Sequence, residues 1–219
     1  MKRVYSLMLD DGVVAAIDRL AYLQNTNRSG FVNQILAEYA SYVTPEKRIR
    51  EAFGRISALL DGQDSFQLAM QPSDTLLSLR SALLYKYNPT VRYSVELFRA
   101  PSGEVGELRV SMRTQNSTLT AYMMLFYRLW TQVEETHVGR VTCRAAEGKY
   151  SRRLVVRENA SAGEAAVSPD TLGELIATYI RTFDQALKAF FERLDDPAAA
   201  ARRIEEIYLR YLRTANLII

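Results

Sequence analysis

Residues 4–39 read VYSLMLDDGVVAAIDRLAYLQNTNRSGFVNQILAEY, and this stretch decides the fold of the N-terminal part of the chain. Within residues 4–9, Tyr5, Leu7 and Leu9 alternate with Val4, Ser6 and Met8. Alternate residues of a strand lie on the same side of it. The pattern therefore predicts a short strand with one face for burial and the other free to contact a partner.

Two amphipathic helices are predicted to follow this strand. Val13, Ile17, Leu20 and Ala21 recur at helical spacing, and Val32, Ile35, Leu36 and Tyr39 do the same after a short turn. Asn27 precedes the second helix and is a good N-cap. A unit of about forty residues buries too little surface to be stable alone, and a single strand has nothing to pair with. We therefore expect it to dimerise or to dock on the rest of the chain.

This strand-helix-helix pattern resembles the ribbon-helix-helix (MetJ/Arc-type) family of DNA-binding proteins, over residues 1–44 only. The resemblance implies a dimer whose two strands pair antiparallel and enter the major groove. It implies base contacts by Val4, Ser6 and Met8, and phosphate contacts by Lys2, Arg3, Asn27, Arg28 and Ser29. The implied dimer core consists of Tyr5, Leu7, Leu9, Ile17, Leu20, Val32, Ile35 and Leu36.

The charge of residues 1–44 qualifies this expectation. Four basic side chains face four acidic ones there, so the formal balance is zero. Because neutralisation of phosphates supplies most non-specific affinity for DNA, binding requires Lys2, Arg3 and Arg28 to be grouped on one face. A module that retains only dimerisation is the alternative interpretation.

Residues 45–219 are predicted to form an α+β domain. Thr44 and Pro45 fit the start of a helix, which places the domain boundary near residue 44. Phe66, Leu68 and Met70 alternate as in a short strand. Ser73 is then expected to cap a helix over residues 75–85.

Two β-hairpins around a central helix are expected next. Residues 91–97 and 108–113 alternate on either side of Pro101-Ser102-Gly103, and residues 141–145 and 150–157 do so around Glu147-Gly148. Between the hairpins, Tyr122, Phe126 and Trp130 belong to a segment that is apolar on several sides, which is typical of a central helix. We expect Trp130 to be buried against the apolar faces of both hairpins.

The chain is expected to end in a helical hairpin over residues 168–218. Ser168-Pro169 and Asp196-Pro197 are helix starts, each with proline at the first turn. A heptad-like seam runs through the first of these helices, at Ile176, Ile180, Phe183, Leu187, Phe190 and Leu194. The seam fits packing within the hairpin and packing across a dimer equally well.

A basic segment covers the second hairpin. Residues 140–157 have a local charge of +5, because Glu147 alone opposes Arg140, Arg144, Lys149, Arg152, Arg153 and Arg157. Three interpretations remain open: a solvated strand face, an additional nucleic-acid contact, and a pocket for an acidic ligand.

Several classes of site are disfavoured by composition. The chain has one cysteine and one histidine, so it can form no intrachain disulfide and no zinc site made of several such ligands. It shows no glycine-rich phosphate loop. We expect neither catalysis nor a cofactor or metal. With no long apolar window and no signal-peptide pattern, we expect a cytoplasmic protein without a membrane partner.

The sequence thus predicts a dimeric transcriptional regulator that reads double-stranded DNA in the major groove. The partners expected are DNA and a second copy of the chain, as a homodimer or a higher even oligomer. Residues 45–219 would add oligomerisation or sense a small-molecule or protein effector. Two alternatives stay open: a DNA-binding factor of plasmid or mobile-element maintenance, and a protein-interaction scaffold whose DNA face has decayed.

Overall fold

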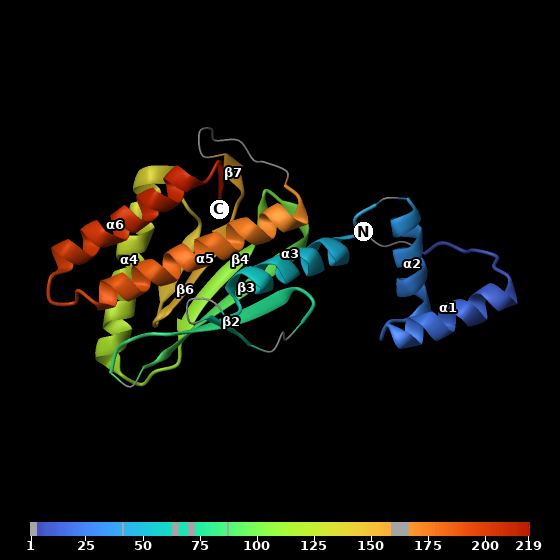
Figure 1. Ribbon diagram of the computed structural model, residues 1–219, viewed down its shortest axis with the longest axis horizontal. Helices are drawn as coiled ribbons and strands as arrows, with labels where there is room; N and C mark the ends of the chain where they lie inside the picture. Colours follow the sequence, from blue (N-terminus) through green and yellow to red (C-terminus); the bar gives the residue numbers. More distant parts are fainter. Residues whose placement is uncertain (1–3, 41, 63–65, 70–72, 87, 159–166) are drawn as a thin grey trace. The chain divides into compact units, whose positions relative to one another are not determined.

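The computed structural model describes residues 4–40, 42–62, 66–69, 73–86, 88–158 and 167–219 (Figure 1). The chain forms two compact units, Met1–Lys47 and Arg48–Ile219. The division lies in the first turn of α3 (Pro45–Leu60), three residues beyond the predicted boundary.

The N-terminal unit contains the two predicted helices, α1 (Asp11–Leu23) and α2 (Arg28–Tyr39). The Asp10 carboxylate accepts the Gly12 N–H at 2.8 Å and so caps α1. Asn25 adopts φ 50° in the turn between the helices, a conformation that asparagine tolerates. Residues 4–9 form neither helix nor strand in the single chain. A ribbon needs a second strand to pair with, so the ribbon-helix-helix arrangement stays a prediction.

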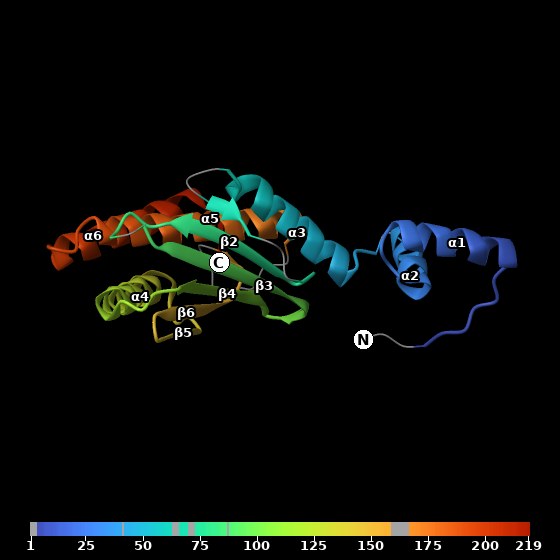
Figure 2. The ribbon, with the colours of Figure 1, turned by 90° about the horizontal axis from the view of Figure 1, so that it is seen from below.

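The larger unit is built on one antiparallel sheet (Figure 2). Its strand order is β1-β2-β3-β4-β6-β5. The strands are β1 (Phe66–Leu68), β2 (Leu76–Ala82), β3 (Thr90–Ser102), β4 (Glu104–Met112), β5 (Cys143–Ala146) and β6 (Lys149–Leu154). Gly103 and Gly148 have positive φ values of 83° and 71° in the two predicted hairpin turns, which favour glycine because it has no Cβ. Together with the helices, this sheet confirms the α+β class.

The helix predicted over residues 75–85 is wrong. Residues 76–82 form β2, which pairs along its whole length with β3. Leu77 and Leu79 point into the core and Ser78 and Arg80 lie on the other face, so the segment has the two-residue period of a strand. The strand predicted at Phe66 and Leu68 is confirmed as β1, whereas Met70 lies outside the described residues.

The two hairpins do not surround the central helix. They join edge to edge through β4 and β6, with Val110 opposite Tyr150, and so belong to the same sheet. The helix α4 (Ser117–Val138) packs on one face of that sheet, where the rings of Tyr127 and Tyr150 stack at 5.1 Å. Trp130 is fully buried, as predicted, although α5 rather than a second hairpin covers part of it.

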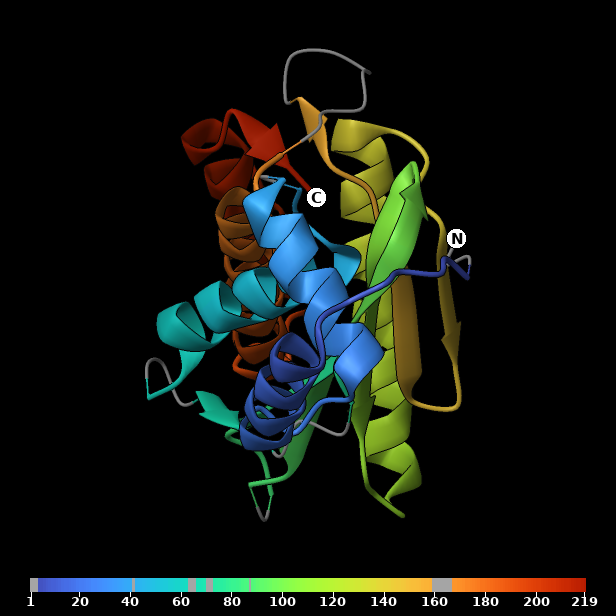
Figure 3. The same cartoon turned by 90° about the vertical axis from the view of Figure 1, so that its right-hand side faces the viewer.

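The helices α3, α5 (Pro169–Phe191) and α6 (Pro197–Thr214) lie together on one side of the sheet in Figure 3. The predicted C-terminal helical hairpin is α5 and α6, but α6 ends at Thr214 and not near residue 218, because Leu217–Ile218 form a strand. Its seam packs within the domain, because Ile176, Ile180, Phe183, Leu187 and Phe190 are buried and Leu194 is partly buried. A short ladder between β7 (Arg157–Glu158) and β8 (Leu217–Ile218) fixes the chain after α6.

The sheet therefore has one buried face and one exposed face. On β3, Val91, Tyr93 and Val95 are buried, whereas Arg92 between them is exposed. Antiparallel sheets can face water on one side in this way. In the described part of the chain, no helix is both long enough and apolar enough to span a bilayer.

Candidate nucleic-acid interface

The segment implied to form the ribbon is almost fully solvent-exposed in the single chain. Val4 is 98% exposed and Leu7 is 62% exposed. Ser6 is exposed as well. Both faces of the segment, including the one implied for the dimer core, are thus largely uncovered within the chain.

Exposed apolar side chains are concentrated in the N-terminal unit. Of the seventeen large hydrophobic side chains that the described residues expose, fourteen lie between residues 4 and 43. They include three of the implied core residues in the helices, Leu20, Ile35 and Leu36, while Ile17 and Val32 are half-buried. Among the described residues of the unit, Ala21 and Phe31 are the buried hydrophobic residues. A concentration of exposed apolar side chains on so small a unit indicates an interaction site.

Phe31 was missed as a core residue by the sequence pattern. It precedes the stripe of Val32, Ile35 and Leu36 by one position, yet it is 6% exposed whereas Leu36 is 54% exposed. Within the chain, Phe31 is thus buried, Val32 is half-buried, and Ile35 and Leu36 remain mostly uncovered.

The N-terminus of α2 offers main-chain donors. The Asn27 side chain accepts the Gly30 N–H at 2.8 Å, and the Asn27 carbonyl accepts the Phe31 N–H at 2.9 Å. Among the described residues, no acceptor is found for the N–H groups of Arg28 and Ser29. Free N–H groups and the positive end of the helix dipole together suit a phosphate.

The Arg28 side chain is already engaged, which corrects the expectation of a free cation. Its Nε donates to Asp18 Oδ1 at 2.7 Å, and its Nη2 bonds the other carboxylate oxygen. The hydrogen bond from Arg28 lowers the pKa of the Asp18 carboxyl, and Asp18 raises the pKa of Arg28. This exposed pair connects α1 to α2. Lys2 and Arg3 lie outside the described residues.

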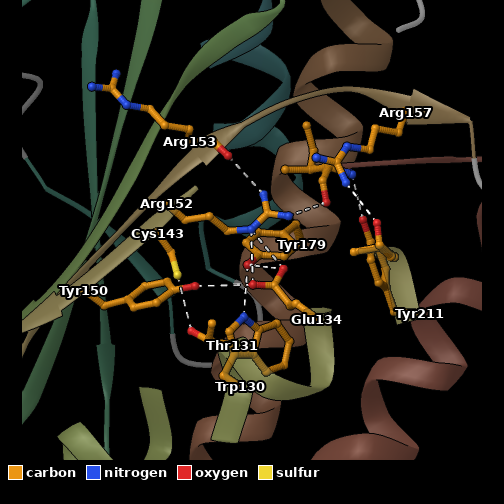
Figure 4. Close-up of polar contacts among 12 residues, drawn as sticks. Trp130, Thr131, Glu134, Cys143, Tyr150, Arg152, Arg153, Arg157, Tyr179 and Tyr211 are labelled. Carbon is orange, nitrogen blue, oxygen red and sulfur yellow. Dashed lines mark hydrogen bonds and ion pairs between the residues drawn. The ribbon is translucent and has the colours of Figure 1, made fainter. Parts of the chain in front are cut away.

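The basic segment over residues 140–157 is not one patch. Arg152 stands on the inner face of the sheet and is buried against Glu134 of α4, at 2.9 Å from Nε to Oε1 (Figure 4). Its position follows from the alternation along β6, where Tyr150, Arg152 and Leu154 all point inward. An interpretation based on charge alone could not distinguish it from its neighbours.

Hydrogen bonds satisfy this buried pair. The Tyr179 hydroxyl donates to Glu134 Oε1 at 2.9 Å, the Tyr150 hydroxyl reaches Oε2 at 3.3 Å, and Arg152 Nη2 donates to the main-chain oxygen of Ile219 at 3.0 Å (Figure 4). Burial raises the pKa of the Glu134 carboxyl, against the lowering effect of Arg152 and the tyrosine hydroxyls. Burial opposes the charge of Arg152, but Glu134 nonetheless raises its pKa. This network stabilises the fold and is not a binding site, because its side chains are buried and not accessible to a ligand.

The other cations of the segment are dispersed. Arg157 donates to the main-chain oxygens of Val138 and Arg140 and so fixes the end of α4. Arg153 lies 3.7 Å from a Glu104 oxygen, with its guanidinium over the Phe98 ring. Arg140, Arg144 and Lys149 are exposed. The predicted accessory patch is thus reduced to separate residues, three of which, Arg144, Lys149 and Arg153, share the exposed face of the sheet.

The described residues contain no group of three or more His, Cys, Asp or Glu side chains that could hold a metal ion. Cys143 lines a shallow groove beside α4 and lies 3.5 Å from the Thr131 hydroxyl. His137, near the end of α4, contacts Glu205 of α6 at 2.9 Å. These residues lie apart and form no catalytic constellation with each other.

Comparisons of the chain with models of protein families, with curated proteins and with solved structures gave no match.

Proposed function

We propose that the N-terminal unit is a dimeric DNA-binding module and that the protein is a transcriptional regulator. In this proposal, residues 4–9 of two chains pair antiparallel and lie in the major groove. The observation that carries the proposal is the concentration of uncovered apolar side chains in residues 4–43. A second copy would cover Tyr5, Leu7 and Leu9 and would supply the missing ladder.

The polar residues of the unit support DNA as the ligand. Ser6 offers a hydrogen bond to a base edge, and Val4 and Met8 could contact thymine methyl groups. The free N–H groups of Arg28 and Ser29 could hold a phosphate on either side of the ribbon. Arg28 would reach a phosphate only by leaving Asp18, which makes its contribution smaller than that of a free arginine.

A protein-interaction scaffold is the second candidate function. It is favoured by the Arg28–Asp18 ion pair and by the balanced charge of residues 1–44. A scaffold would dimerise through the same apolar surface but would not bind DNA in a salt-sensitive way.

Electrophoretic mobility shifts with the full chain and with a Leu7→Asp variant test the proposal. The variant would bury an unpaired charge in the dimer, so dimerisation and sequence-specific DNA binding should both be lost. Leu84→Asp is the matched control, because Leu84 is 80% exposed in the larger unit. Sequence-specific DNA binding that persists in Leu7→Asp would overturn the proposed ribbon. A wild-type dimer without salt-sensitive binding to any DNA would favour the scaffold.

A further inference from the structure

The exposed face of the sheet carries rows of side chains that the strand register places side by side. One row consists of Arg80 on β2, Arg92 on β3, Ser111 on β4 and Lys149 on β6. Arg80, Arg92 and Lys149 are exposed. Among the described residues, none of these three cations has an acidic partner within ion-pair distance. We call this row the basic row.

The neighbouring row differs from the basic row at Arg109. Two residues further along the strands, Arg109 donates to Glu96 at 2.8 Å and also bonds Glu107. Both acids lie on the same exposed face as Arg109. The face therefore neutralises Arg109 locally, whereas among the described residues the basic row, like the edge residue Arg144, has no counter-charge.

Arg80 and Arg92 stand directly opposite each other on adjacent strands. Like charges at directly opposite positions destabilise a sheet. A serine or glutamate at either position would remove this repulsion without disturbing the core, since both side chains point outward. The arrangement is unfavourable in the free protein and becomes favourable when an anion lies across the row.

We propose that the basic row binds the phosphate backbone of duplex DNA, outside the segment read by the N-terminal unit. Adjacent strands are about 4.8 Å apart, so the row extends over ~15 Å from β2 to β6. Over that length one strand of a duplex carries about four phosphates. Three long, flexible cationic side chains on this polar face are therefore enough to reach several phosphates at once. This contact is independent of residues 4–9 and carries no sequence information.

The test measures the affinity of the full chain for a random-sequence duplex from about 50 to about 200 mM salt. The variant replaces all three cations: Arg80→Gln, Arg92→Gln and Lys149→Gln. The control, Arg128→Gln with Arg202→Gln and Arg210→Gln, alters three exposed cations on α4 and α6. Both triple variants lower the formal net charge from +3 to 0, so they differ only in where charge is lost.

We expect the basic-row variant to reduce the slope of log affinity against log salt by about three units, and the control to change it little. Equal slopes in the two variants would overturn the inference. A change of oligomeric state in the basic-row variant, seen by sedimentation with an unaltered slope, would overturn it too, because the face would then be a protein interface.

Leu7→Asp separates this inference from the proposed function. If the salt-dependent binding to random duplex survives in Leu7→Asp and is lost in the basic-row variant, the sheet face binds DNA. Sequence-specific binding then tests the ribbon separately, because its persistence in Leu7→Asp would show that the proposed ribbon is wrong. If Leu7→Asp abolishes binding and the basic-row variant matches its control, the ribbon stands and the basic row does not bind.

Discussion

Glu134 and Arg152 form a buried ion pair, in which each charge is stabilised by its partner. Both side chains are inaccessible to solvent, and each has hydrogen bonds from or to neighbouring elements. Removing one partner leaves the other as an uncompensated buried charge. A large loss of stability is therefore expected when one partner is removed, and not when both are replaced.

Glu134→Ala should lower the free energy of unfolding by about 3–5 kcal/mol, as for other broken buried pairs. Glu206→Ala, which breaks an exposed pair with Arg203, should cost less than about 1 kcal/mol. Denaturant unfolding monitored by Trp130 fluorescence measures both. Replacing the pair together, as Glu134→Leu with Arg152→Met, should recover most of the loss. Equal costs for Glu134→Ala and Glu206→Ala would contradict the structural role of the pair.

The buried tyrosines predict a loss of stability at alkaline pH. Burial raises the pKa of Tyr211 to about 12 and raises those of Tyr93, Tyr150 and Tyr179 well above the ordinary value. Because the folded state holds these protons more tightly, their contribution to stability is complete below about pH 10 and is lost as the pH rises toward 12.

Tyrosinate absorbance and circular dichroism, followed together through this pH range, test that expectation. The buried tyrosines should ionise only as the larger unit unfolds. Ionisation of Tyr93, Tyr150 and Tyr179 near pH 10, with the fold intact, would contradict their burial.

At the residue scale, the sequence pattern predicted Trp130 as buried because its helix is apolar on several sides. It could not place Arg152, since a charged residue in an amphipathic strand is normally expected to face solvent. The alternation of Tyr150, Arg152 and Leu154 could have indicated the burial of Arg152, because it places this arginine on the apolar side of β6.

Among the elements, α3 and α5 approach closely at a single glycine. A Cβ on Gly173 would lie 2.6 Å from the Ala52 carbonyl oxygen and 2.7 Å from the Arg55 Cβ. Real Cβ atoms are not found that close to other heavy atoms, so the two helices would have to separate. Gly173 therefore sets the distance between these helices.

Gly173→Ala should destabilise the larger unit by about 1–3 kcal/mol, the range for overpacking in a close-packed core. Gly54→Ala is the control in α3, where a Cβ would meet nothing within 4 Å. It should stabilise the helix by about 0.5–1 kcal/mol, because glycine is a poor helix former. Thermal unfolding compares the two, and a stabilising Gly173→Ala would show that the helices are less closely packed.

The elements also show where sequence patterns fail. The starts of α5 and α6 were predictable because proline follows a capping residue at Ser168 and Asp196. β2 was not, because the cap-like Ser73 favoured a helix and the alternation of Leu77 and Leu79 with Ser78 and Arg80 spans few residues. That error also concealed the basic row, since Arg80 could not be placed opposite Arg92.

For the whole molecule, the division into two units predicts two unfolding transitions. Trp130 is the single tryptophan and reports on the larger unit, whereas circular dichroism reports on both. If residues 4–9 hold two chains together, the midpoint of the N-terminal transition should rise with protein concentration. The midpoint of the transition reported by Trp130 should not depend on protein concentration. Coincident, concentration-independent transitions would indicate that the N-terminal unit is stable without a partner chain.

The organisation of the molecule was predictable in outline, because the N-terminal pattern ends where Thr44 and Pro45 begin a new helix. The joining of two hairpins into one sheet was not, since strand order depends on contacts between distant residues such as Val110 and Tyr150. Nor does the single chain show the proposed ribbon, which would require residues from two chains.

In vitro selection from random-sequence duplexes tests the central claim most directly, namely that two N-terminal units read DNA as a dimer. The account predicts that the full chain enriches a short sequence present in two copies related by the dimer symmetry. Ser6→Ala should weaken the enrichment, Leu7→Asp should abolish it, and Leu84→Asp should leave it unchanged. A full-length dimer that enriches no sequence, or a Leu7→Asp variant that enriches the same sequence as wild type, would contradict the account.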